Sequence, residues 1–138
     1  MRIVIDTNVI ISALFFGGLP DKFLELVFDG KIHAVGNFQI IKEYIDTYEE
    51  LSKKLERRTL KRNLREVIEK LKTIVVTTNL KICRDPDDDK FINCAIDGKC
   101  KYIVSGDNDL LEIGSVANVE IVTVRDFMEE YKIGERKK

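Results

Sequence analysis

The sequence has few of the side chains that bind soft metal ions or form disulfides. One histidine, His33, and three cysteines are present among 138 residues, and no two cysteines form a C-x-x-C pair. These counts argue against a zinc cluster and against a disulfide framework. We expect Cys83, Cys94 and Cys100 to be reduced packing residues. Any metal ion bound here should then be a hard cation with oxygen ligands.

Long apolar runs are also missing. No stretch reaches the roughly 20 apolar residues that span a bilayer, which predicts no membrane segment. The first residues, MRIVIDTNVI, lack both a long apolar run after a basic start and a small-residue cleavage site. We therefore expect no signal peptide and a cytoplasmic location.

The composition is that of a globular protein, with 44% hydrophobic and 34% charged residues. The length fits one compact domain over residues 1–138. A formal net charge of −1 hides a basic segment from Lys53 to Lys72, where nine lysines and arginines against three glutamates give a local charge of +6. Its candidate RNA-binding residues are Lys53, Lys54, Arg57, Arg58, Lys61 and Arg62. A solvated helix face explains the same charges equally well.

Strand and helix patterns alternate along the chain. Runs of β-branched residues predict strands at 2–5, 31–35, 73–77, 102–105 and 119–124. Apolar periodicity and turn residues predict helices at 8–16, 20–30, 37–51, 60–71, 85–97, 108–112 and 125–131, with a frayed tail at 134–138. This alternation predicts an α/β fold in which helices cover both faces of a parallel sheet. Ligand sites in such sheets form outside the carboxyl ends of the strands.

Two short polar segments follow predicted strands. Asp6-Thr7-Asn8 comes after the first strand, and the segment 105–109 (SGDND) comes after the strand at 102–105. Their carboxylates suit a metal ion at that edge of the sheet. For each segment alone, an ordinary helix cap or turn explains the residues as well.

Asp88 stands on what should be a buried helix face. Phe91, Ile92 and Ala95 follow it at +3, +4 and +7, so the four residues share one side of the predicted helix. A carboxylate buried without a cation or hydrogen-bond donors is strongly penalised. The pattern favours a metal ligand, and the alternative is a first-turn acid that interacts with the helix dipole.

The helix predicted at 37–51 carries a further acid. Its expected buried stripe consists of Phe38, Ile41, Ile45 and Tyr48. Glu43 lies away from that stripe, which predicts a solvent-accessible side chain. Periodicity alone does not distinguish Glu43 from other surface glutamates.

Four separated blocks resemble a known family. The chain contains IVIDTNVIISAL at 3–14, IIKEY at 40–44, DPDDDKFINCAI at 85–96 and YIVSGDNDLL at 102–111. Together and in this order they resemble the PIN-domain family, over nearly the entire chain. The resemblance is strongest to the archaeal and bacterial branch of toxin components of toxin–antitoxin pairs, the VapC-like ribonucleases.

The resemblance implies a three-layer α/β/α sandwich and an acidic pocket that binds Mg²⁺ or Mn²⁺ and hydrolyses RNA. The acids that it assigns to catalysis and metal binding are Asp6, Glu43, Asp88 and Asp107. Asp109 matches a more variable fifth acid, and Asn8 and Ser105 match polar residues that support the pocket. It also implies a homodimer or higher homo-oligomer and a small antitoxin partner. Hard divalent ions prefer carboxylate oxygens and can activate a water molecule, which fits this chemistry.

Two alternatives differ in testable ways. A haloacid-dehalogenase-like phosphatase also begins with an aspartate after its first strand, but it needs a second aspartate two residues later, where this chain has Asn8. That reading is therefore disfavoured. A PIN-like subunit that binds RNA or supports an assembly with little cleavage stays open, because cleavage depends on distances between the acids.

Overall fold

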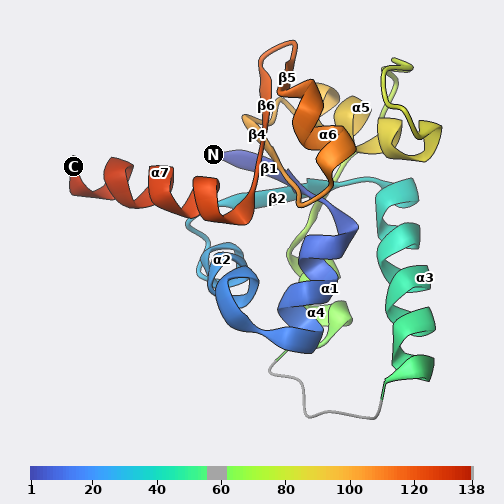
Figure 1. Cartoon of the computed structure of the whole chain (residues 1–138), viewed down its shortest axis with the longest axis vertical. Helices are drawn as coiled ribbons and strands as arrows, with labels where there is room; N and C mark the ends of the chain where they lie inside the picture. The colour runs from blue at the N-terminus through green and yellow to red at the C-terminus, as the bar shows by residue number, and fades with distance from the viewer. Residues whose placement is uncertain (56–61, 138) are drawn as a thin grey trace.

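The fold is built around one twisted sheet (Figure 1). The computed structural model describes residues 1–55 and 62–137. The described residues form six strands: β1 (Arg2–Ile5), β2 (His33–Gly36), β3 (Lys72–Thr73), β4 (Tyr102–Val104), β5 (Ser115–Val116) and β6 (Val119–Val122). Their order is β3-β2-β1-β4-β6-β5, and every pair is parallel except β5 with β6. The predicted parallel α/β sheet is confirmed, and the short β5–β6 hairpin was not predicted.

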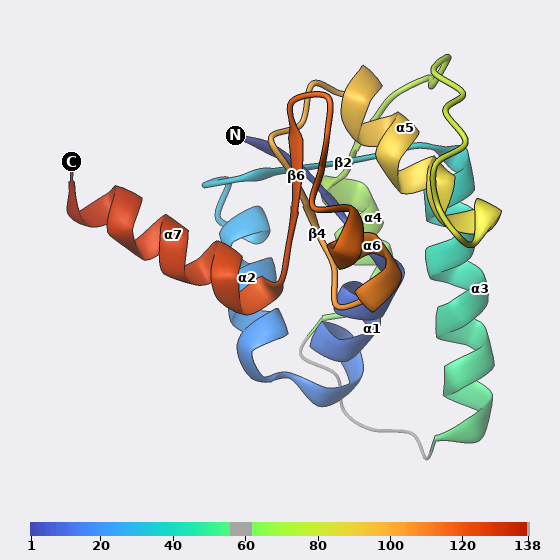
Figure 2. The ribbon, with the colours of Figure 1, turned by 45° about the horizontal axis from the view of Figure 1, so that its top comes forward.

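Helices cover both faces of this sheet. The described helices are α1 (Thr7–Phe16), α2 (Gly18–Phe28), α3 (Phe38–Lys54), α4 (Leu64–Lys70), α5 (Asp89–Asp97), α6 (Asn108–Ile113) and α7 (Val124–Arg136), with a 3₁₀ turn at Pro86–Asp88. Figures 1 and 2 show α5 on one side of the sheet and α1, α2 and α4 on the other, with α7 against α2. α3 runs beside α1 and also contacts α5. This arrangement is the expected three-layer α/β/α sandwich.

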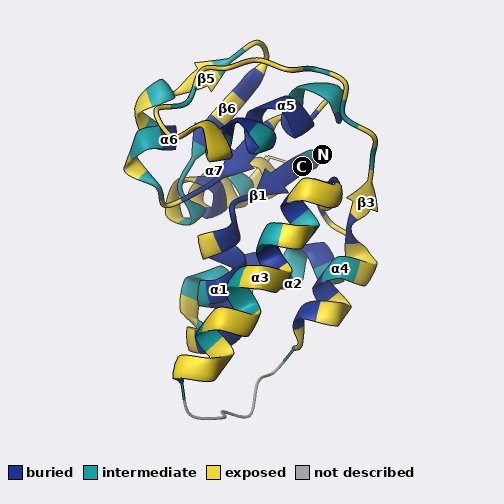
Figure 3. Cartoon of the chain, turned by 90° about the vertical axis from the view of Figure 1, so that its right-hand side faces the viewer, coloured by how far each residue is buried: buried dark blue, intermediate teal, exposed yellow. Residues whose placement is uncertain are grey.

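The core lies between the sheet and these helices. Ile3, Val4 and Ile5 of β1 are fully buried, as expected for a central strand of a parallel sheet with helices on both faces. Figure 3 shows β1 and the inner side of α1 buried, while the outer faces of the helices are exposed. The cysteines are free, with Cys94 and Cys100 buried, which confirms the packing role expected for them. None of the described helices is long and apolar enough to span a bilayer.

The buried face of α3 differs from the predicted stripe. Ile40 and Tyr44 are fully buried, whereas Phe38 is 77% exposed and Ile45 is 37% exposed. The Tyr44 hydroxyl donates a hydrogen bond to the carbonyl oxygen of Ile5, which fixes the rotation of α3 at the end of β1. The prediction for Phe38 and Ile45 was wrong, because two overlapping sets of apolar residues on this helix have helical spacing and the packing partner selects one of them.

The predicted strand at 73–77 is also wrong beyond its first residue. β3 ends at Thr73, and residues 74–83, here called the α5-bound segment, run along α5. The helix holds this segment with side chains spaced four residues apart. Asp97 accepts from the backbone N–H of Thr77 and Thr78, Asn93 bonds both the N–H and the C=O of Leu80, and Asp89 accepts from Ile82 and Cys83. Side chains of one helix thus replace the hydrogen bonds of a sheet ladder.

Other predicted boundaries moved by a few residues. α2 begins at Gly18, two residues before the expected start, and α5 begins at Asp89 after the 3₁₀ turn. α7 continues to Arg136, so the frayed tail predicted from Gly134 is wrong over 134–136. The first residues of the helix predicted at 60–71 lie outside the described residues, and the remainder contains α4.

Candidate functional site

Two neighbouring strands bring two of the predicted acids to one edge of the sheet. β1 and β4 are parallel and pair Ile5 with Val104 in register. The next residue after β1 is Asp6, and its backbone N–H donates to the Val104 carbonyl oxygen at 2.9 Å. The chain after β4 turns through Ser105 to Asp107. Because the strands are parallel, their carboxyl ends meet, and the acids that follow lie together.

Asp6 is almost fully buried, with 5% exposure, at the position that precedes α1. Its side chain makes no capping hydrogen bond to that helix. Instead, one carboxylate oxygen accepts a hydrogen bond from Ser105 Oγ at 2.7 Å. Burial raises the pKa of Asp6, the Ser105 hydrogen bond opposes this, and the charges of Glu43 and Asp107 raise the pKa further. The Asp6 side chain therefore does not cap α1, which was the alternative explanation for this residue.

Ser105 links Asp6 to the second acid. It is fully buried, and its Oγ also accepts from the backbone N–H of Asp107 at 3.0 Å. Asp107 caps α6, because its Oδ1 accepts from the backbone N–H of Asp109 at 3.1 Å. Asp107 Oδ1 therefore has the turn-capping role that the sequence allowed. The same side chain also interacts with Asp88. Ser105 thus orients both strand-end aspartates.

Asp88 lies near Asp6 and Asp107 but belongs to the segment that leads into α5. It ends the 3₁₀ turn directly before α5, is half-buried, and makes no capping hydrogen bond. Burial raises its pKa to about 7, with further contributions from the negative charges of Asp107 and Asp6 and a hydrogen bond with Asp107. Three aspartates from three chain segments therefore repel one another across a small space.

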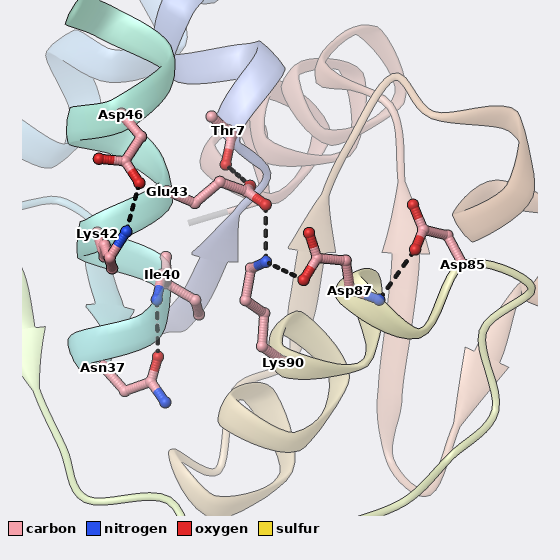
Figure 4. Close-up of polar contacts among 9 residues, drawn as sticks. All are labelled: Thr7, Asn37, Ile40, Lys42, Glu43, Asp46, Asp85, Asp87 and Lys90. Atoms are coloured by element: carbon pink, nitrogen blue, oxygen red, sulfur yellow. Dashed lines mark hydrogen bonds and ion pairs between the residues drawn. The ribbon is translucent and has the colours of Figure 1, made fainter.

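Glu43 is held by two contacts on the other side of the site (Figure 4). Thr7, buried at the start of α1, donates its hydroxyl to Glu43 Oε2. Lys90 Nζ lies 2.7 Å from Glu43 Oε1 and 3.6 Å from Asp87 Oδ1. Burial lowers the pKa of Lys90, but the hydrogen bond to Glu43 and its charge outweigh burial, so the pKa is raised overall. Glu43 is half-buried rather than freely accessible as predicted.

The structure gives Thr7, Lys90 and Asp89 roles at the site that the sequence did not assign to them. Thr7 lies next to the first acid, which was a usable signal. Lys90 stands in the first turn of a helix, where the dipole disfavours a positive charge, and such a placement invites a search for a partner. Asp89 is the most buried acid of the DPDDDK block, because it accepts hydrogen bonds from the α5-bound segment.

The remaining predicted residues lie outside this cluster or at its rim. Asn8 is exposed, and Asp109 Oδ1 lies 3.8 Å from the exposed Arg84. Lys53 and Lys54 are exposed at the end of α3. Arg62 instead faces the protein, where it bonds Asp21 at 2.8 Å and covers the Phe28 ring at 4.5 Å. The other three basic candidates, Arg57, Arg58 and Lys61, lie outside the described residues.

The donor set is chemically suited to a hard divalent ion. No described lysine or arginine forms an ion pair with Asp6, Asp88 or Asp107. A cation would relieve the repulsion that raises the pKa values of Asp6 and Asp88. Within residues 1–55 and 62–137, no three acidic, histidine or cysteine side chains already stand as a ligand set.

A groove of about 950 Å³ lies between α3, the α5-bound segment and the start of α5, and Glu43 is among the residues that line it. Asp87 and Lys90 line the groove together with Glu43, and Phe38 lies on its α3 side. Lys81 lines it from the α5-bound segment and is exposed. Through Glu43, the groove borders the acidic site.

Comparison with known proteins agrees with this geometry. The family model described as "PIN domain" matches residues 2–109, which contain all the acids of the site. The chain is 35% identical to the uncharacterized protein MJ1680 of Methanocaldococcus jannaschii over 147 aligned positions, covering 96% of this chain and 92% of that protein. The strand-end aspartates, the sandwich and the family match lead to the same result. The chain belongs to the PIN-domain family, whose members are generally nucleases.

Proposed function

We propose that this protein is an endoribonuclease that hydrolyses phosphodiester bonds with Mg²⁺ or Mn²⁺ held by carboxylates. The observation that carries the proposal is the convergence of Asp6, Asp88 and Asp107 from three segments without a described cationic partner. Repulsion among these carboxylates raises the free energy of the folded chain, and a bound cation would remove this cost. Such clusters are therefore typical of binding sites.

Each residue has a defined task in this proposal. A bound divalent ion lowers the pKa of a coordinated water molecule and offsets charge that develops on the phosphate. Asp6, Asp88 and Asp107 would hold the ion, and Ser105 keeps Asp6 and Asp107 oriented. Glu43, fixed by Thr7 and Lys90, lines the groove.

The groove supports a nucleic-acid strand as the substrate. The exposed Phe38 ring offers a surface on which a base can stack, and Lys81 offers charge to a phosphate. The preference for RNA, a homodimer and a small antitoxin partner follow from the resemblance to toxin components, and we include them in the proposal. A small open reading frame next to the gene would support the antitoxin.

The proposal is tested by digestion of end-labelled single-stranded RNA with Mn²⁺, with and without EDTA. We expect internal cleavage by the unaltered chain and a loss of at least about 100-fold with Asp6→Asn or Asp107→Asn, as for removal of a group that holds a catalytic ion. Glu49→Gln, on an exposed turn of α3, should cut like the unaltered chain. Cleavage that persists in Asp6→Asn would refute the assignment.

One observation favours a second candidate, a PIN-like RNA-binding subunit. Glu43 is already neutralised by Lys90, so one of the family acids is engaged in a protein ion pair. Such a subunit would bind the labelled RNA without Mn²⁺-dependent cleavage. The same assay, read by fluorescence anisotropy before digestion, separates the two functions.

A further inference from the structure

The acids of the site fall into two electrostatic groups. Both Glu43 carboxylate oxygens are occupied, Oε2 by the Thr7 hydroxyl and Oε1 by the Lys90 ammonium (Figure 4). Asp6 accepts from the Ser105 hydroxyl, Asp107 accepts from the Asp109 backbone N–H, and Asp88 shares a hydrogen bond with Asp107. No described lysine or arginine neutralises these three aspartates. Among the described residues, a lysine therefore neutralises Glu43, whereas Asp6, Asp88 and Asp107 have no lysine or arginine partner.

Lys90 is placed to serve Glu43. Its side chain is only 10% exposed, although lysines are rarely buried without a partner. Of its two acidic contacts, Asp87 lies at 3.6 Å and is 79% exposed, whereas Glu43 lies at 2.7 Å and is 26% exposed. The less solvated and closer partner dominates the interaction, because water screens the other. Glu43 is thus the reason that an ammonium group can stay here.

We propose that Lys90 is a built-in counter-ion for Glu43, so that the site takes a single divalent ion, held by Asp6, Asp88 and Asp107. This inference rests on the metal site of the proposed function and specifies its occupancy. The Lys90 ammonium lies beside Glu43 and neutralises the carboxylate that would otherwise attract a second ion. Lys90 acts through Glu43 and is a positioning residue rather than a ligand.

The test counts Mn²⁺ ions bound to the full chain by titration calorimetry and by the electron-paramagnetic-resonance signal of free Mn²⁺. We expect one ion for the unaltered chain and two for Lys90→Met, in which Glu43 is left negative. The second ion should bind at least about tenfold more tightly to Lys90→Met than to the unaltered chain, because removal of one close charge uncovers an attraction of that order. Lys90→Arg, which keeps the charge, should bind one ion.

Matched variants control for general charge effects and for folding. Lys42→Met removes an ammonium that also pairs with a nearby acid, Asp46, but on the exposed surface, and it should leave the count at one. The double variant Lys90→Met/Glu43→Gln, which removes both charges of the pair, should still bind one ion, with affinity within about threefold of the unaltered chain, because Glu43 is not a ligand in this scheme. Thermal melting confirms that each variant folds. If Lys90→Met fails to fold, Lys90→Gln, which removes the charge and keeps a polar end group, replaces it, with two ions expected.

The outcomes separate this inference from the proposed function. Two ions of similar affinity in the unaltered chain, or a loss of more than about threefold in affinity with Lys90→Met/Glu43→Gln, would overturn the role given to Lys90. An unchanged count in a folded Lys90→Met would do so as well. If the unaltered chain cuts RNA but binds two ions, only the inference fails. If it neither binds Mn²⁺ nor cuts RNA, the proposed function fails.

Discussion

Replacing Asp88 by asparagine should make the metal-free protein more stable at pH 8. The folded-state pKa of Asp88 is raised to about 7 from the ordinary 3.8, because the group is partly desolvated and lies near Asp107 and Asp6. Between these two values the folded state holds a proton that the unfolded state has lost. The free energy of unfolding therefore falls as the pH rises through this window, and the destabilisation is complete above pH 7.

The size of the effect follows from the same pKa values. The interval from 3.8 to about 7 corresponds to roughly 4 kcal/mol at full strength. Asp88 is half-buried, so solvent screens part of this interaction, and we expect about 2 kcal/mol at pH 8. At pH 4 the carboxyl group is protonated and resembles the amide, so the difference from Asp88→Asn should approach zero.

Urea denaturation in EDTA, from pH 4 to pH 8, measures this directly for the unaltered chain and Asp88→Asn. Glu49→Gln, an exposed acid on α3, serves as the control and should stay within about 0.5 kcal/mol at every pH. A stability difference for Asp88→Asn that does not change with pH would refute the electrostatic reasoning, as would a less stable variant at pH 8. Saturating Mn²⁺ should reverse the order, since the ion stabilises only a chain that binds it.

Three further outcomes test the groove, the α5-bound segment and the support of the acids. Phe38→Ala should bind single-stranded RNA about fivefold or more weakly by anisotropy in EDTA, since a stacked base contributes roughly 1–3 kcal/mol, whereas Phe16→Ala, also exposed, should not. Asn93→Ala removes the hydrogen-bond partner of the Leu80 N–H and C=O groups and should lower the free energy of unfolding by about 1–3 kcal/mol in urea. An unchanged value would contradict the role given to Asn93 in holding the α5-bound segment. Ser105→Ala removes the hydrogen bond that lowers the pKa of Asp6, so Mn²⁺ binding measured against pH should move to higher pH, and no movement would count against this role.

Some features followed from the sequence because they depend on neighbours along the chain. The run Arg2–Ile5 and the turn after it define a buried strand that ends at Asp6, and no distant contact is needed to place them. The strand at Tyr102–Val104 ends in the same way before Ser105. Parallel pairing then places the two following acids at one edge, so their proximity could be expected before any coordinates.

The tertiary structure decided which way each helix faces and which charges meet. Helical spacing on α3 was compatible with burying either Phe38 and Ile45 or Ile40 and Tyr44, and packing against the end of β1 selected the second pair. That rotation turns Glu43 inward.

The partner of Glu43 and the anchoring of the α5-bound segment were decided in the same way. Lys90 meets Glu43 across two helices, and the α5 side chains capture a segment that its sequence assigns to a strand. The sequence by itself determined the alternating fold, the strand-end aspartates and, through the order of its motifs, the family. It did not determine these pairings, because each is a contact between distant segments whose energy depends on orientation, and local periodicity carries no information on orientation.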